Sequence, residues 1–353
     1  MSERRDKMDA KKNPVYTDIL KIISVLGIVG ISVISTKWSA ASVGSISWIF
    51  MTVMQSALRF AFPAVIMIAG IKYLSPTEAP TAKRLYSNDI LKLFVALAFW
   101  SILYAVIDSF LLHNGSIVSC FKDVVIKTMA SENHFWLIFG LIGLLIVSPL
   151  LKKIALDKKT LEYFLIIWIV FTVIGNIAVS IPDPYINIEK RLATFKMSAA
   201  IHFSGYFCLG YYLDKFEIKK PIRILTYFLS AFSIAAFIGV TYYLSSKEGK
   251  TDSTFLVNIK PMTVLVPSAF FLFAKNMFKK KPAPKAVAFI AKASLGIYFC
   301  HGIVLKALMQ ASLLPKDMRT VYWIFITTAA TYLVSLIISA ILNFIPFVKK
   351  YVV

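Results

Sequence analysis

Long apolar runs alternate with short polar segments along all 353 residues of the chain. About 20 consecutive apolar residues form a helix of roughly 30 Å, which is enough to cross the hydrocarbon core of a bilayer. The pattern therefore predicts an all-α polytopic membrane protein with about ten transmembrane helices. The predicted helices fall near residues 17–36, 46–73, 89–112, 135–152, 161–180, 197–213, 222–244, 258–277, 287–312 and 320–345.

The connections between the runs are basic at alternate ends of the predicted helices. The segments dense in lysine and arginine are 1–16, 83–84, 152–159, 215–223 and 279–285. Because positively charged connections stay in the cytoplasm, this pattern and an even number of spans place both termini there. No connection is long enough for a second domain. We expect one integral-membrane domain over residues 1–353, with 1–16 as a basic cytoplasmic tail.

The composition agrees with a membrane location. With 58% hydrophobic and only 16% charged residues, the chain cannot bury its apolar surface in a soluble core. The net charge of +21 could suggest nucleic-acid binding, but the basic residues lie in short connections, which a membrane explains better. Cys120, Cys208 and Cys300 are odd in number and imply neither a disulfide framework nor a metal site.

The first run carries two charges, Asp18 and Lys21, at its start. A charged side chain inside a membrane helix costs about 2.5–3.5 kcal/mol on insertion scales, so both residues need a reason. One interpretation places them at the inner interface, with Lys21 extending to the surface and Asp18 beside the positive helix N-terminus. The other is functional, and it comes from a resemblance.

Asp18-x-x-Lys21, followed by ten residues and Ser32, resembles the opening of the acyltransferase 3 family. This family comprises integral-membrane O-acyltransferases of bacterial glycans, and it usually has Asp-x-x-Arg, ten residues and then His. The resemblance implies that the histidine position accepts the proton during transfer. In this chain that position is Ser32, and the family's arginine is Lys21.

Arg59 lies roughly 13 residues into the second run, too deep to reach an interface by extending its side chain. A guanidinium at that depth must be paired or must line water. It also resembles the family's Arg before a Val-Pro-Phe-Phe run, here followed by Pro63. Arg59 therefore either faces substrate or forms a structural ion pair, for which Asp108 in the third run is the expected partner.

The ninth run contains Ser294-Leu-Gly-Ile-Tyr298-Phe-Cys-His301, which resembles the family's Ser-Leu-Gly-Ile-Tyr-x-x-His. At these spacings, Ser294, Tyr298 and His301 share one helix face. A histidine inside a membrane indicates function by default, although it can also simply bond a neighbouring helix.

Two further motifs contain histidines. His134 and Trp136 open the fourth run and resemble the family's His-Leu-Trp-Phe. They either anchor the helix at the membrane interface or form the bottom of a glycan site on the outer side. His202 in the sixth run precedes residues 205–212, which are close to the family's Tyr-Phe-x-x-Gly-Tyr-Tyr. We expect His202 to lie within about two turns of the outer face.

The family also keeps paired basic residues between the second and third spans, where they could hold the phosphates of acyl-CoA. Lys83, Arg84 and Lys92 occupy that part of this chain. A solvated cluster on the cytoplasmic side explains the same residues equally well.

Acyl transfer to a hydroxyl needs a base, positive charge for the developing oxyanion and a dry pocket. Since the first helix offers Ser32 in place of an imidazole, His301 and His202 are the candidate bases. Arg59 or Lys21 could hold the oxyanion or the thioester. Ser32 could itself carry the acyl group only with a base within hydrogen-bond reach, which the sequence does not show.

The resemblance implies a membrane-bound O-acyltransferase. It would move an acyl group, expected to be acetyl, from cytosolic acyl-CoA to a hydroxyl of a cell-surface or lipid-linked glycan, in the plasma membrane of a bacterium. The expected partners are acyl-CoA, the glycan and membrane lipids, with no nucleic acid and no tightly bound cofactor. The alternative is an inactive relative that exports or binds a glycan or lipid. An unrelated transporter is disfavoured by the scattered motif matches.

Overall fold

The computed structural model describes residues 14–77, 79–112, 134–170, 199–253, 262–278, 283–313 and 318–351, and this part of the chain is helical with no β-strand. The elements are α2 (Val15–Trp38), α3 (Ile46–Leu58), α4 (Ala61–Leu74), α5 (Ala82–Arg84), η1 (Leu85–Ile90), α6 (Leu91–Leu112), α8 (Trp136–Leu156), α9 (Lys158–Ile169), α12 (Ala199–Lys215), α13 (Lys220–Glu248), α15 (Met262–Phe278), α16 (Lys285–Gln310), α17 (Thr320–Leu342) and α18 (Pro346–Tyr351).

These helices confirm an all-α polytopic membrane protein. Within the described residues, seven helical segments are long and apolar enough to cross a membrane. They are α2, α3 with α4, α5 through the first part of α6, α8, α13, α16 and α17. The other three predicted runs overlap shorter helices, namely α9 with 12 residues and α12 and α15 with 17 each. Part of the predicted run 161–180 lies outside the described residues.

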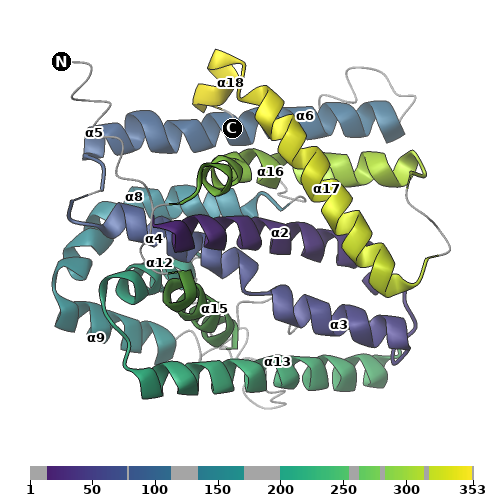
Figure 1. Cartoon of the computed structure of the whole chain (residues 1–353), viewed down its shortest axis with the longest axis horizontal. Coiled ribbons are helices and arrows are strands. Elements are labelled where there is room, and N and C mark those ends of the chain that lie inside the picture. The colour runs from purple at the N-terminus through teal and green to yellow at the C-terminus, as the bar shows by residue number, and fades with distance from the viewer. Residues whose placement is uncertain are drawn as a thin grey trace, which may run out of the picture.

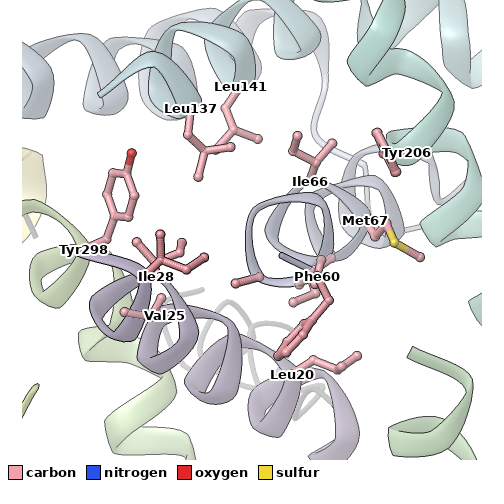
Figure 2. Close-up of a cluster of buried hydrophobic side chains, with 14 of the residues drawn as sticks. Leu20, Val25, Ile28, Phe60, Ile66, Met67, Leu137, Leu141, Tyr206 and Tyr298 are labelled. Carbon is pink, nitrogen blue, oxygen red and sulfur yellow. The ribbon is translucent and has the colours of Figure 1, made fainter. Parts of the chain in front are cut away.

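Helix α2 is the centre of the bundle. It packs against α3, α4, α15, α16 and α17, and Figure 1 shows it below α6 and above α13. Its buried residues Leu20, Val25 and Ile28 join a cluster with side chains of α4, α8, α12 and α16, including Tyr298 (Figure 2). The first apolar run of the sequence therefore forms the central helix of the structure.

The outer surface of the bundle is apolar. Large hydrophobic side chains are exposed on α13, at Phe228 and Phe232, and on α17, at Phe325 and Ile337. Exposed apolar surface of this extent is unusual for a soluble monomer and is typical of a face that contacts lipid.

The second predicted span is interrupted inside the membrane. Helix α3 ends at Leu58 and α4 begins at Ala61, so that Arg59 and Phe60 form the junction. The cause is Pro63 in the first turn of α4: its ring clashes with the carbonyl four residues earlier, that of Arg59, and it has no N–H to donate. Arg59 therefore lies at a break in the helix and not within a regular turn.

Helices α4 and α12 are in backbone contact. A Cβ added at Gly70 would lie 1.8 Å from the carbonyl oxygen of Phe207, and one added at Gly210 would lie 2.0 Å from that of Met67. Only glycine permits this approach, and close packing of this kind is a main source of helix association in membranes.

Candidate functional site

Two helices far apart in sequence bring a serine and a histidine together. Ser32 Oγ of α2 lies 3.2 Å from Nε2 of His301 on α16, across 269 residues of sequence. Helices α2 and α16 pack against each other, which fixes the pair. His301 is fully buried at 0% exposure, whereas Ser32 remains partly exposed. Of the two residues, Ser32 is the more exposed.

The contact made by the second ring nitrogen of His301, Nδ1, determines the tautomer of the imidazole. Nδ1 lies 2.6 Å from the carbonyl oxygen of Tyr298, one turn earlier on α16. A carbonyl oxygen can only accept, so Nδ1 carries the hydrogen, and in the neutral ring Nε2 is the acceptor. Ser32 then donates its hydroxyl proton to Nε2. The carbonyl of Ile28, 3.1 Å from Ser32 Oγ, is the competing acceptor for that proton.

His134, just before α8, contacts the same Tyr298 carbonyl as His301. Its Nε2 lies 2.9 Å from the same Tyr298 carbonyl oxygen and therefore donates to it. The Tyr298 hydroxyl in turn donates to the main-chain carbonyl of His134. The rings of His134 and His301 have centroids 4.2 Å apart at an interplanar angle of 49°. One carbonyl thus orients two imidazoles.

Tyr104 of α6 is a residue of this region that the sequence reasoning did not select. Its hydroxyl donates to the carbonyl of Phe299 at 2.9 Å and accepts from the backbone N–H of Ile303 at 3.2 Å. Those two groups pair with each other in a regular helix. A Cβ added at Gly302 would lie 2.5 Å from the Tyr104 hydroxyl, so the glycine admits it. In the sequence, Tyr104 belongs to none of the family motifs and is notable only because it lies one turn before Asp108.

Arg59 belongs to a second polar chain attached to α2. Its Nη2 donates to Oε1 of Gln55 at 3.2 Å, and Gln55 Nε2 donates to Oγ of Ser35 at 3.0 Å. Arg59 Nε is buried and has no partner among the described residues. Gln55 and Ser35 were not selected from the sequence either. Since Ser35 is one turn beyond Ser32, roughly 4.5 Å along the axis, the Arg59 chain and the His301 chain meet α2 at neighbouring turns.

Several predicted site residues lie apart from the Ser32–His301 pair. Lys21 Nζ is 3.5 Å from Asp18, and Lys21 lies roughly 16 Å from Ser32 along the helix axis. The hydroxyl of Ser294 bonds the carbonyl of Ile290 at 3.3 Å, two turns before His301.

Trp136 is exposed and contacts other aromatic rings. Its centroid is 5.8 Å from that of Phe203 and 5.0 Å from that of Phe62. His134, two residues earlier, lies in the site, so the motif of the fourth span is divided between two environments.

Two predicted residues have side chains outside the described part of the structure. His202 lies in the first turn of α12, and Asp108 lies in the second half of α6. Their predicted roles as a base and as the partner of Arg59 stay predictions.

The predicted donor-binding residues lie at the opposite end of α6 from Tyr104. Lys83 and Arg84 in α5 are exposed, and Lys92 at the start of α6 is partly buried. Lys72 on α4 and Lys292 on α16 lie near Lys92, together with Asp89, which pairs with Lys72 at 3.3 Å. Three helices thus gather lysines into one basic patch, which sequence spacing alone does not reveal.

The two described cysteines do not form a disulfide with each other. Cys208 and Cys300 are buried free thiols, and Cys120 lies outside the described residues. Within the described ranges, no three histidine, cysteine, aspartate or glutamate residues cluster as a possible ion site.

The fold and the site define a polytopic helical membrane protein with a histidine–serine pair between two central helices. A family model described as an acyltransferase domain matches residues 15–340, nearly the whole chain. The chain therefore belongs to the acyltransferase 3 family, which confirms the resemblance inferred from its motifs, and it is a membrane acyltransferase in general terms. No curated protein and no solved structure matches it.

Proposed function

We propose that this protein moves an acyl group, acetyl in the simplest case, from acyl-CoA on the cytoplasmic side to a hydroxyl of a surface or lipid-linked glycan. Family membership supports acyl transfer in a membrane. The donor, the acyl group, the acceptor and the bacterial plasma membrane as the location are parts of the proposal.

The observation that carries the proposal is the 3.2 Å approach of His301 Nε2 to Ser32 Oγ. Ser32 occupies the position at which the resemblance expects an imidazole. Helix α16 brings an imidazole next to Ser32, and Nε2 is the acceptor in its neutral ring because Nδ1 donates to the Tyr298 carbonyl. His301 is therefore our candidate for the general base that takes the acceptor's proton.

Arg59 is our candidate for stabilising the oxyanion. It lies at a helix break, and Gln55 ties it to α2 one turn from Ser32. A guanidinium held in place before the reaction stabilises negative charge without the cost of reorganisation. Lys21 is the weaker candidate for this role, because it pairs with Asp18 at the far end of α2.

The basic patch of Lys72, Lys92 and Lys292 is our candidate for binding the donor's phosphates. Ammonium groups bind phosphate as point charges. Lys72 and Lys292 are exposed and Lys92 is partly buried. The exposed Lys83 and Arg84 would extend the patch toward the cytoplasm. This placement agrees with the orientation expected from the basic connections.

The test uses the full-length protein in lipid nanodiscs with radiolabelled acetyl-CoA and glycan extracted from cells that lack the gene. We expect release of CoA and transfer of label to the glycan. In His301→Gln, which keeps a polar side chain of similar length, we expect transfer to fall about 10²–10⁴-fold while membrane insertion persists. If the wild-type protein neither releases CoA nor labels glycan, the inactive relative is the better interpretation.

A further inference from the structure

We propose that Ser32 is the nucleophile of the reaction and carries the acyl group as an ester between donor and acceptor. This inference rests on the proposed acyltransferase function and deepens it by naming the group to which the acyl chain is transiently bonded. Two observations carry it: the hydrogen-bonded histidine, and the difference in exposure between the two residues.

The geometry meets the requirement for an activated serine. Such a nucleophile needs a base in hydrogen-bond contact and a third group that orients the base. Here His301 Nε2 is 3.2 Å from Ser32 Oγ, and the Tyr298 carbonyl is 2.6 Å from His301 Nδ1. The carbonyl takes the orienting position that a carboxylate holds in the Ser-His-Asp arrangement. His134 bonds the same oxygen and so helps to fix it.

The burial of His301 favours Ser32 as the first group that substrate meets. The imidazole is completely buried, whereas Ser32, whose hydroxyl lies 3.2 Å from the imidazole Nε2, is a partly exposed residue. We therefore expect a substrate to contact Ser32 before the buried imidazole. Direct proton abstraction from the acceptor, with Ser32 as a bystander, would require the serine to move aside.

In the first half-reaction, the acyl group moves from CoA to Ser32. Ser32 Oγ attacks the carbonyl carbon of the thioester, and its proton passes to Nε2 of His301. The C–S bond then breaks, the acyl group stays on Oγ as an ester, and the CoA sulfur leaves with the proton from the imidazolium. Arg59 stands one turn away on the same helix to stabilise the intermediate's oxyanion.

The second half-reaction repeats these steps with the acceptor. A glycan hydroxyl gives its proton to the restored Nε2 and attacks the ester carbonyl carbon. The bond from that carbon to Ser32 Oγ breaks, and Oγ recovers its proton from the imidazolium. No electron transfer or further reactant is needed.

The structural alternative is that Ser32 only caps the carbonyl of Ile28, a common state for a serine inside a membrane helix. The two roles differ in a covalent product. We would incubate the wild-type protein with radiolabelled acetyl-CoA without acceptor, quench in acid and map the labelled peptide by mass spectrometry. We expect up to one acetyl group per chain on Ser32, and its loss when glycan is added.

The variants are Ser32→Ala, Ser32→Cys and, as a matched control, Ser24→Ala, a buried serine two turns earlier on α2. We expect Ser32→Ala to lose the label and to transfer at least about 10³-fold more slowly. Ser32→Cys should form a thioester that neutral hydroxylamine cleaves, unlike the oxygen ester. Ser24→Ala should label normally.

Transfer by the wild-type protein without label, together with a Ser32→Ala variant within about tenfold of wild type, would overturn the inference and leave the proposed function standing. Absence of both transfer and label in the wild-type protein would overturn both. Size-exclusion profiles of the variants in nanodiscs separate loss of chemistry from loss of fold.

Discussion

Tyr104 donates a hydrogen bond from α6 to the main-chain carbonyl of Phe299 on α16, at 2.9 Å, and accepts one from Ile303 N at 3.2 Å. The two contacted residues flank His301. Because the hydroxyl bonds two backbone groups that pair with each other in a regular helix, we expect it to influence the local path of α16.

Tyr104→Phe removes the hydroxyl, so the carbonyl of Phe299 and the N–H of Ile303 each lose this hydrogen-bond partner. We expect the loss of about 1–3 kcal/mol of stability and a measurable fall in transfer, because α16 then presents His301 differently. Thermal unfolding and transfer rates measure the two effects. Tyr332→Phe is the matched control, because its buried hydroxyl has no hydrogen-bond partner among the described residues. Equal effects of the two substitutions would contradict a role for these two hydrogen bonds.

The hydrogen bonds from Arg59 to Gln55 and from Gln55 to Ser35 predict that the effects of substituting Arg59 and Gln55 are coupled. Arg59→Lys keeps the charge but loses the planar fork, and we expect transfer to fall about 10²-fold, as for removal of one oxyanion donor. Gln55→Ala should produce part of that loss by releasing the guanidinium. In the double variant the losses should not add, and rates for the four proteins measure this. Independent effects would show that Gln55 does not position Arg59.

The contact between α4 and α12 predicts a strong dependence on glycine. Gly70→Ala would place a methyl group 1.8 Å from the carbonyl oxygen of Phe207. The helices must then separate, at a cost of about 1–3 kcal/mol or more. Gly239→Ala in α13 is the control, since nothing lies within 4 Å of its added Cβ. We expect it to be neutral or to stabilise the helix by up to about 1 kcal/mol. Thermal unfolding distinguishes the two.

Asp157 predicts a pH effect outside the membrane-spanning segments. Its carboxylate accepts from the hydroxyl of Thr160 at 2.7 Å and from the backbone N–H of Thr160 at 2.8 Å, and these bonds lower the pKa of Asp157. A lowered folded-state pKa contributes stability that is fully present above the unfolded value of about 3.9 and is lost as pH falls through the folded value.

Asp157→Asn can still cap α9 but does not titrate. We expect the difference in melting temperature between wild type and Asp157→Asn to shrink as the pH is lowered from 6 to 3. A difference that stays constant over this range would show that the carboxylate makes no linked contribution.

Much of the fold could be predicted from the sequence, because apolar runs of spanning length have few alternatives in a chain this hydrophobic. The interruption at Arg59 was only partly foreseeable. A proline such as Pro63 favours a kink or an end of a helix, but it does not show that the arginine itself would lie at the junction. A helix interruption can be predicted from the sequence when its cause is local, as it is for a proline.

The site was less accessible to sequence reasoning. The motifs identified Ser32 and His301 as candidates, but a contact across 269 residues depends on how α2 and α16 pack. Tyr104 and Gln55 lie in no motif and became visible only through the groups that they bond. Lys21 shows the reverse, since it belongs to a motif and lies far from the pair.

The carbonyl of Tyr298 also determines how His301 would handle a proton. Nδ1 donates to it whether the ring is neutral or charged, so only Nε2 changes its occupancy. The imidazole can therefore shuttle hydrogen without flipping or swinging. In a tightly packed interior where a ring rotation would displace its neighbours, a stationary shuttle is the kind that can turn over quickly.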